Sequence, residues 1–194
     1  MAGLTRFEPQ TRMSPVLDAW LFSLLYGWFH RPPWEGLMSA LTHLGDPWVV
    51  TLLAVAGAAE SARAWVGKES APRLPWAGIL IAPLITRGLK GLVDRPRPFE
   101  ILERTSFPSG HATGAFALAA VLSLRWPKLQ GFFWITAAAV AFSRVAMGKH
   151  WPSDVVAGAL IGVVTVTGLS WIEKKSQKKG HRSTPHLSRT TFRS

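Results

Sequence analysis

The chain has 194 residues, a length that suits one domain. Hydrophobic residues make up 48% of it and charged residues only 17%, a composition that excludes a disordered protein. The absence of cysteine excludes a disulfide scaffold, a cysteine-ligated zinc site and thiol catalysis. The formal net charge of +11 favours a nucleic acid or an anionic membrane surface as partner, and the position of the charges decides between them.

The N-terminal part differs from the rest of the chain. Residues 1–14 form an N-terminal segment in which we find no pattern of a cleavable signal peptide. Residues 15–44 begin with a short apolar stretch that carries Asp18, and residues 31–35 then break it. We expect an interfacial helix, a break and a second short helix that leads to Gly45. A shallow membrane span in this region is the alternative.

Apolar runs further along the chain predict membrane spans at residues 46–64, 74–92, 109–126, 130–148 and 154–172. The runs are apolar around the whole helix, and tryptophans lie at their edges, as at a membrane interface. Gly158 and Gly162 form a GxxxG pair that allows close helix approach. We therefore predict an all-α fold, a polytopic transmembrane helical bundle of five or six spans over residues 15–172. The alternative is a soluble helical bundle with many tryptophans in its core.

Most of the positive charge lies at the C-terminus. Seven basic residues and no acidic residue follow Glu173, and without them the net charge falls to +4. Residues 173–194 lack apolar periodicity, so we expect a disordered basic tail. By the excess of basic residues on that side, the tail faces the cytoplasm and the opposite face lies outside. A nucleic-acid partner is then not needed to explain the charge.

Three polar clusters are predicted to share one face of the membrane. They comprise residues 90–98, 107–111 and 143–154. The first two share a loop, and the third returns to the same face after two spans. Ionisable groups gathered at membrane depth are costly and usually functional.

The residue types in these clusters indicate a phosphate site. Lys90, Arg97 and Arg144 are cations that suit an anion with several oxygens and would repel a divalent metal, so we expect no metal and no cofactor. Ser109 and Gly110 lie at a predicted helix N-terminus, where free N–H groups favour phosphate. A lone basic residue at a span end is more often a snorkelling residue, but three that face one loop are not explained in this way.

Two histidines complete the predicted site. His150 and Asp154 are four residues apart, so the carboxylate can fix one imidazole nitrogen and make the other a better nucleophile. His111 is then available as a general acid for the leaving oxygen and later as a base for water. We interpret the other histidines as ordinary interfacial or tail residues: His30, His43, His181 and His186.

These residues carry a family resemblance. Lys90 with Arg97-Pro98, then Pro108-Ser109-Gly110-His111, then Ser143-Arg144 with His150 and Asp154, resemble the three-part signature of the type 2 phosphatidic acid phosphatase superfamily. That superfamily also contains vanadium haloperoxidases and bacterial acid phosphatases. The resemblance implies that His150 forms a phosphohistidine, that Asp154 orients it and that His111 protonates the leaving group. It also implies that the remaining signature residues hold the phosphate oxygens without a metal: Lys90, Arg97, Ser109, Gly110 and Arg144.

The leading hypothesis is therefore an integral membrane lipid phosphatase, in bacteria an inner-membrane enzyme with its active site facing the periplasm. Its expected partners are membrane lipids and a lipid phosphate substrate. Candidates are undecaprenyl diphosphate, phosphatidylglycerophosphate, phosphatidic acid and lipid A phosphate, with a slight preference for the first. A lipid phosphotransferase with the same intermediate is one alternative, and a non-catalytic protein that binds anionic lipid through its tail is another.

Overall fold

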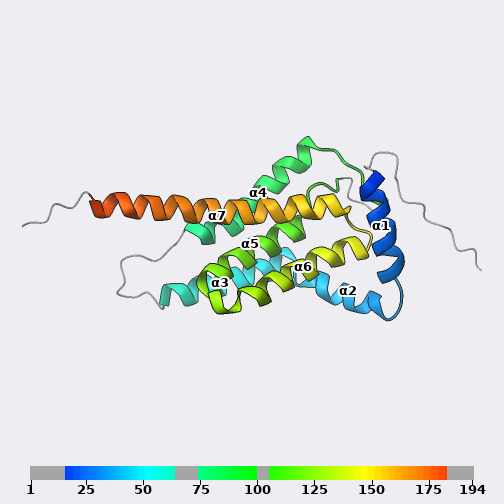
Figure 1. The fold of residues 1–194 in the computed structure, drawn as a ribbon, viewed down its shortest axis with the longest axis horizontal. Helices are drawn as coiled ribbons and strands as arrows, with labels where there is room; N and C mark the ends of the chain where they lie inside the picture. Colours follow the sequence, from blue (N-terminus) through cyan, green and yellow to red (C-terminus); the bar gives the residue numbers. More distant parts are fainter. Residues whose placement is uncertain (1–15, 64–73, 100–104, 183–194) are drawn as a thin grey trace, which may run out of the picture.

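A computed structural model describes residues 16–63, 74–99 and 105–182 of the chain, so the predicted N-terminal segment 1–14 lies outside it. Within these residues the regular structure is helical (Figure 1). The elements in chain order are α1 Val16–Phe29, α2 Trp34–His43, α3 Pro47–Arg63, α4 Leu74–Leu92, α5 Gly110–Arg125, the short 3-10 helix η2 Pro127–Leu129, α6 Gln130–Ala146 and α7 Pro152–Arg182.

The helices α3 to α7 coincide with the five apolar runs, so the all-α prediction is confirmed. Two segments are long and apolar enough to cross a membrane, Pro127–Ala146 and Pro152–Lys179. A third candidate arises if α2 and α3, which meet at an angle of 50°, form one broken span. Helix α5, with 16 residues, is short for a span on its own, since a span needs about 20 residues. The structure thus supports two to three candidate spans.

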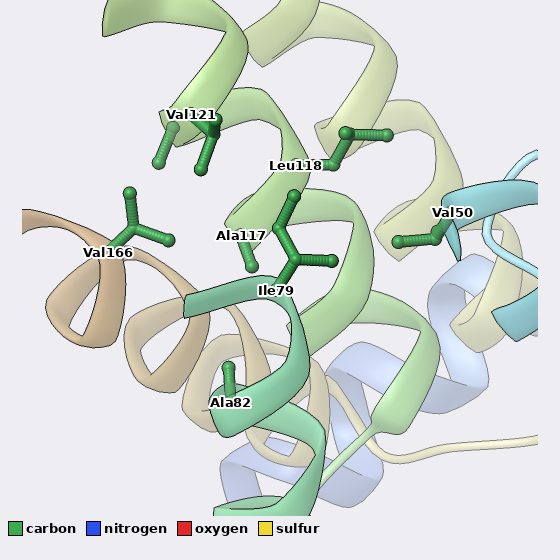
Figure 2. Packing of buried hydrophobic residues seen from close by; sticks show 8 residues of the cluster. Val50, Ile79, Ala82, Ala117, Leu118, Val121 and Val166 are labelled. Carbon is green, nitrogen blue, oxygen red and sulfur yellow. The ribbon is translucent and has the colours of Figure 1, made fainter. Parts of the chain in front are cut away.

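Helix α5 lies at the centre of the bundle and contacts α3, α4, α6 and α7 (Figure 1). Its buried side chains are mostly small, which lets its neighbours approach closely. In Figure 2, Ala117 and Val121 of α5 face Val166 of α7 and Ile79 of α4. This core holds the N-terminus of α5 in a fixed position relative to α7.

The closest approach in the core is made by the GxxxG pair of α7. A Cβ atom on Gly158 would lie 2.4 Å from the carbonyl oxygen of Ser109, and one on Gly162 would lie 2.5 Å from the carbonyl oxygen of Thr113. Both distances are too short for any side chain. The glycines therefore bring the backbone of α7 against the first turns of α5, as the sequence indicated.

Large apolar side chains cover the outside of the bundle. Leu52 on α3, Ile135 on α6 and Val164 on α7 are each more than 60% exposed. An apolar surface this extensive on several helices is typical of contact with lipid. Together with the apolar helices it identifies a membrane protein.

Helix α1 runs across one end of the bundle, the end at which α7 begins (Figure 1). It is held there by Phe22, whose ring is buried and lies 5.1 Å from the ring of Trp151, measured between centroids. The two short helices predicted around a break within residues 15–44 are therefore present as α1 and α2.

The prediction of a disordered tail from residue 173 is wrong for its first part. Helix α7 continues to Arg182, and residues 183–194 lie outside the described part of the chain. The sequence from Glu173 to Lys179 is rich in Glu, Lys and Gln, which favour helix even without an apolar face. A helix already formed in the apolar segment needs no new nucleation to extend through such residues.

Candidate active site

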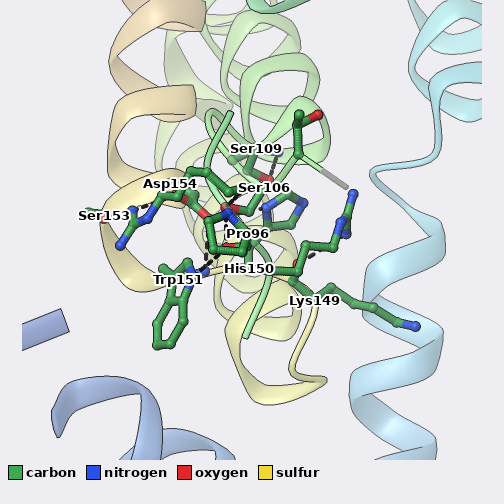
Figure 3. Close-up of polar contacts among 12 residues, drawn as sticks. Pro96, Ser106, Ser109, Lys149, His150, Trp151, Ser153 and Asp154 are labelled. Atoms are coloured by element: carbon green, nitrogen blue, oxygen red, sulfur yellow. Dashed lines mark hydrogen bonds and ion pairs between the residues drawn. The ribbon is translucent and has the colours of Figure 1, made fainter. Parts of the chain in front are cut away.

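The three polar clusters meet at the end of the bundle where α4 and α6 end and α5 and α7 begin (Figure 3). Arg97, after α4, donates from Nη1 to the carbonyl oxygen of Lys149 at 3.0 Å. Ser109, just before α5, donates its backbone N–H to the carbonyl oxygen of Asp154 at 2.9 Å. These contacts bring the three predicted clusters together at one end of the bundle.

His150 lies in the loop between α6 and α7 and is 2% exposed. Its Nδ1 lies 3.5 Å from Oδ2 of Asp154, an ion-pair distance that is too long for a good hydrogen bond. The carboxylate thus faces one imidazole nitrogen, as the four-residue spacing predicted. The other nitrogen, Nε2, is then the one suited to bond to a substrate.

The environment of His150 favours the neutral imidazole. Burial, together with the charges of Arg144 and Arg97, lowers the pKa of His150 from 6.5 to about 4, against the opposing effect of Asp154. A neutral imidazole keeps the lone pair that a nucleophile needs. His150 is therefore neutral at neutral pH and has no proton to lose there.

Asp154 is completely buried, and donors at both of its carboxylate oxygens fix its orientation. Its Oδ2 accepts the backbone N–H of Trp151 at 3.0 Å, which caps the first turn of α7. Its Oδ1 accepts Nη1 of Arg95 at 2.7 Å. The indole of Trp151, also buried, is tied to the loop after α4 because its Nε1 donates to the carbonyl oxygen of Pro96 at 2.9 Å.

His111 occupies the first turn of α5 and is also paired with a carboxylate. Its Nε2 lies 3.0 Å from Oδ1 of Asp46, in the link between α2 and α3. The other oxygen of Asp46 lies 2.9 Å from Nδ1 of His43. Asp46 therefore joins a histidine that we interpreted as ordinary to one of the predicted catalytic histidines.

The cations approach the site from different elements. Arg144, in the last turn of α6, donates from Nη1 to Oγ1 of Thr42 at 2.6 Å. Lys90, in the last turn of α4, donates to the carbonyl oxygen of Thr105 at 3.1 Å. With the buried guanidinium of Arg97, these groups come from three sides of one bundle end.

Ser109 is the N-cap of α5, and its buried Oγ accepts the N–H of Ala112 at 3.5 Å. Its own N–H is already bonded to Asp154, so that N–H is not available to an anion. Gly110 is exposed and begins the helix. The unpaired N–H groups that helix geometry leaves in the first turn thus begin at Gly110.

A family model described as the PAP2 superfamily matches residues 74–178, more than half of the chain. The chain belongs to the PAP2 superfamily. The matched range contains every site residue predicted from the sequence, together with α4, α5, α6 and most of α7.

Several curated relatives of this chain are named as phosphatases. The chain is 36% identical over 107 residues to an undecaprenyl-diphosphatase of Sulfolobus acidocaldarius, covering 48% of this chain and 47% of that protein. It is 31% identical over 144 residues to a decaprenylphosphoryl-5-phosphoribose phosphatase of Mycobacterium tuberculosis, covering 68% and 76%. A lipid A 1-phosphatase of Rhizobium johnstonii is 29% identical over 177 residues, covering 76% and 71%. The chain thus aligns with about half the length of the archaeal relative.

Two solved structures share the PAP2 fold of this chain. LpxE of Aquifex aeolicus superposes with a TM-score of 0.67 at 24% sequence identity, covering 81% of this chain and 97% of that one. A transmembrane PAP2 type phosphatidylglycerolphosphate phosphatase of Bacillus subtilis gives a TM-score of 0.63 at 24% identity, covering 82% and 85%. The arrangement of helices around the site is therefore that of membrane PAP2 proteins.

Three acidic or basic residues of this PAP2 site escaped the sequence reasoning. Asp18 lies in α1, Asp46 lies in the link between α2 and α3, and Arg95 lies inside the first polar cluster. Arg95 was passed over because the spacing of the motif selects only Lys90 and Arg97. An acid in an apolar stretch is a signal in itself, since burying it is costly without a partner, and by this signal Asp18 could have been found.

Within residues 16–63, 74–99 and 105–182, no group of three or more histidine, aspartate or glutamate side chains is arranged to hold a metal ion.

Proposed function

We propose that the chain is an integral membrane lipid phosphatase that hydrolyses a phosphate monoester or diphosphate on a lipid headgroup through a phosphohistidine at His150. One observation carries the proposal. A buried histidine, with a carboxylate at Nδ1, lies near Arg97 of the loop after α4 and Arg144 of the last turn of α6, at the end of an apolar bundle. This set supplies a nucleophile and an anion site in one place.

In the first step Nε2 of His150 attacks phosphorus, and the bond from phosphorus to the leaving oxygen breaks. Arg97, Arg144 and Lys90, with the N-terminus of α5 at Ser109 and Gly110, hold the phosphate oxygens and neutralise the charge that spreads over them. Asp154 stabilises the positive charge of the phosphorylated imidazole. The leaving oxygen takes its proton from His111.

In the second step a water molecule attacks phosphorus and the bond to Nε2 breaks. His111, now neutral, accepts a proton from the water, and inorganic phosphate leaves. Asp46 supports both steps because its carboxylate at Nε2 of His111 orients the ring and stabilises its protonated form. Nδ1 of His111 is then the nitrogen that exchanges the proton with the substrate. The cations neutralise the charge on the phosphate oxygens, so the proposed mechanism needs no metal.

The surroundings of the site support a lipid substrate. An apolar cavity of about 220 Å³ lies between the α2–α3 link, α5 and α6, and its lining includes Leu44, Ala115 and Val140. Leu44 is two residues from Asp46, and Ala115 is one helical turn from His111. A hydrocarbon chain in this cavity would place its headgroup phosphate near His111.

Among lipid phosphates we favour undecaprenyl diphosphate. Two relatives carry undecaprenyl-diphosphatase in their names. One is the Sulfolobus protein, and the other is the "putative undecaprenyl-diphosphatase YbjG" of Escherichia coli, which is 39% identical over 61 residues. Lipid A phosphate, phosphatidylglycerophosphate and phosphatidic acid are the other candidates. The names of the Rhizobium relative and the Bacillus structure support the first two of these.

We further propose that the bundle spans a bacterial inner membrane five or six times, with the active site at the periplasmic face. Helix α1 would lie in that interface, since it crosses the bundle end that carries the site. The other end of α7 carries the exposed lysines Lys174, Lys175, Lys178 and Lys179, which suit the cytoplasmic side.

A phosphate-release panel tests the function. The purified full chain in detergent is offered the four lipid phosphates and a soluble monoester, with and without chelator. We expect release from at least one lipid in preference to the soluble ester, unaffected by chelator. His150→Ala and His111→Ala should each abolish it, whereas His30→Ala, outside the site, should not.

Full activity of either active-site variant contradicts the mechanism, and loss of release with chelator contradicts the metal-free site. Label that passes from a labelled donor to another lipid identifies a phosphotransferase.

A further inference from the structure

A second buried carboxylate lies behind the His150–Asp154 pair and comes from α1. Asp18 is 5% exposed although it lies in the first turn of an apolar helix. Its Oδ1 accepts the backbone N–H of Ser153 at 2.9 Å, and its Oδ2 accepts the hydroxyl of Ser153 at 2.6 Å. Both oxygens of Asp18 are therefore bound to the first turn of α7, next to Asp154.

Arg95 connects the two carboxylates. Its Nη2 donates to Oδ2 of Asp18, and its Nη1 donates to Oδ1 of Asp154 at 2.7 Å. Nη1 also donates to the hydroxyl of Ser153 at 2.6 Å. The guanidinium lies 5.5 Å from the centre of the buried Trp151 ring. The planar group is thus held by its partners in one orientation, as a lysine could not be.

The charges in this cluster do not cancel. One cation is shared by two carboxylates, so Asp18, Arg95 and Asp154 carry a formal net charge of −1. If Arg95 faced Asp154 alone, the pair would be neutral and would offer little to a positive imidazole. Because Asp18 takes part of the interaction with Arg95, the excess negative charge stays beside Nδ1 of His150, 3.5 Å from Oδ2 of Asp154.

We propose that Asp18 and Arg95 are positioning residues for phosphate transfer at His150. Arg95 fixes the orientation of the Asp154 carboxylate, and Asp18 keeps the cluster negative so that it stabilises the positively charged phosphohistidine. The inference rests on the proposed function, and it goes beyond it by making α1 part of the active site. Asp18 lies well before residue 74, where the match to the family begins.

The kinetic test uses Asp18→Asn, which removes the charge and keeps the shape. A hydrogen bond to a charged group contributes about 1.5–3 kcal/mol, so we expect kcat on undecaprenyl diphosphate to fall by about 10-fold or more with KM little changed. The kcat of Arg95→Met should fall further, and Arg95→Lys should recover part of the lost kcat. Asp94→Asn and Arg87→Met, exposed neighbours on the same segment, are the matched controls.

A double variant separates positioning from general stability. If Asp18 acts through Arg95, the Asp18→Asn/Arg95→Met chain should lose no more kcat than Arg95→Met alone. If the two substitutions caused independent structural defects, their fold-losses of kcat would instead multiply in the double variant. Thermal unfolding of each variant in detergent shows whether the fold is intact. If an Arg95 variant does not fold, the kcat of Asp18→Asn decides the question.

A second measurement needs no turnover. Orthovanadate, a tetrahedral phosphate analogue that becomes five-coordinate when it bonds to the nucleophile, should bind Asp18→Asn and Arg95→Met more weakly than the wild-type chain by calorimetry, and Asp94→Asn equally well. Wild-type kcat and orthovanadate affinity in both variants overturn this inference and leave the proposed function standing. A wild-type chain that neither releases phosphate nor binds orthovanadate overturns both.

Discussion

His150 is a buried base among cations, and this environment determines how it responds to pH. Burial, Arg144 and Arg97 all disfavour the imidazolium, and Asp154 opposes them only in part. The nucleophile therefore stays neutral over a range in which an exposed histidine would be protonated. The same environment suits a dianionic phosphate, since the charge that repels a proton attracts the substrate.

The pH dependence of kcat/KM should show this shift. Because the pKa of His150 is lowered to about 4, the acid limb should lie near pH 4 rather than 6.5. In the unfolded chain this imidazole binds a proton below about pH 6.5, whereas in the native chain it does so only below about pH 4. The free energy of unfolding should therefore decrease as the pH falls from about 6.5 to about 4. An acid limb near pH 6.5 in the wild-type chain would contradict this environment.

Asp46 should be required for the action of His111. In Asp46→Asn the carboxylate at 3.0 Å from Nε2 is lost and the side-chain shape is kept, so kcat should fall by on the order of 10-fold or more. His43→Gln is the matched control, because the side chain of His43 is 67% exposed and its pair with the same Asp46 is solvated. Equal losses in both variants would show that Asp46 acts only through the fold of the α2–α3 link.

At this scale the sequence predicts the residues with a fixed spacing and misses those that arrive from elsewhere. His150 and Asp154 are four residues apart and could be paired by helix geometry alone. Asp46 meets His111 across 65 residues, and Asp18 meets Ser153 across 135. Contacts of that separation depend on how helices pack, which residue spacing does not specify.

At the scale of the elements, the site depends on the contact between α5 and α7. Gly158 lies against the carbonyl oxygen of Ser109, and Gly162 lies against that of Thr113. Ser109 caps α5 and also donates its N–H to Asp154. The same close approach that packs the bundle therefore sets the distance between the first turn of α5, the proposed phosphate-binding turn, and the first turn of α7 with Asp154.

Gly162→Ala should destabilise the chain by about 1–3 kcal/mol, because its Cβ would lie 2.5 Å from a backbone oxygen that cannot move without shifting a helix. Gly168→Ala, on the same helix with open space around it, should be neutral or stabilising by up to about 1 kcal/mol. Unfolding by denaturant in detergent measures both. A Gly162→Ala chain as stable as Gly168→Ala would show that the helices are not in close contact.

The apolar runs predict the helices well because a membrane helix must bury or face lipid with nearly all its side chains. The extension of α7 from Glu173 to Arg182 was missed because it has no apolar pattern and is helical by propensity and continuation. The sequence also does not predict the angle of 50° at which α2 and α3 meet. It results from the Gly45–Asp46 link, which packs against α6 and binds α5.

At the scale of the whole molecule, an apolar bundle places all its chemistry at one end. The helices that carry the three motifs lie within the part of the chain that matches the PAP2 superfamily. Helix α1 packs against that end of the bundle through the contact of Phe22 with Trp151. The high net charge of the chain has two separate origins. Part of it lies in the C-terminal segment, and part belongs to the cations around the proposed phosphate site.

The central claim is that His150 carries the phosphate during turnover. The measurement is to stop the reaction with alkali, digest the chain and locate the phosphate by mass spectrometry, with phosphorus-32 label to quantify it. We predict label on His150 that is stable to alkali, lost in acid and absent from His150→Ala. Label on another residue, or steady release of phosphate with no labelled chain at any time in the first turnover, would contradict the account.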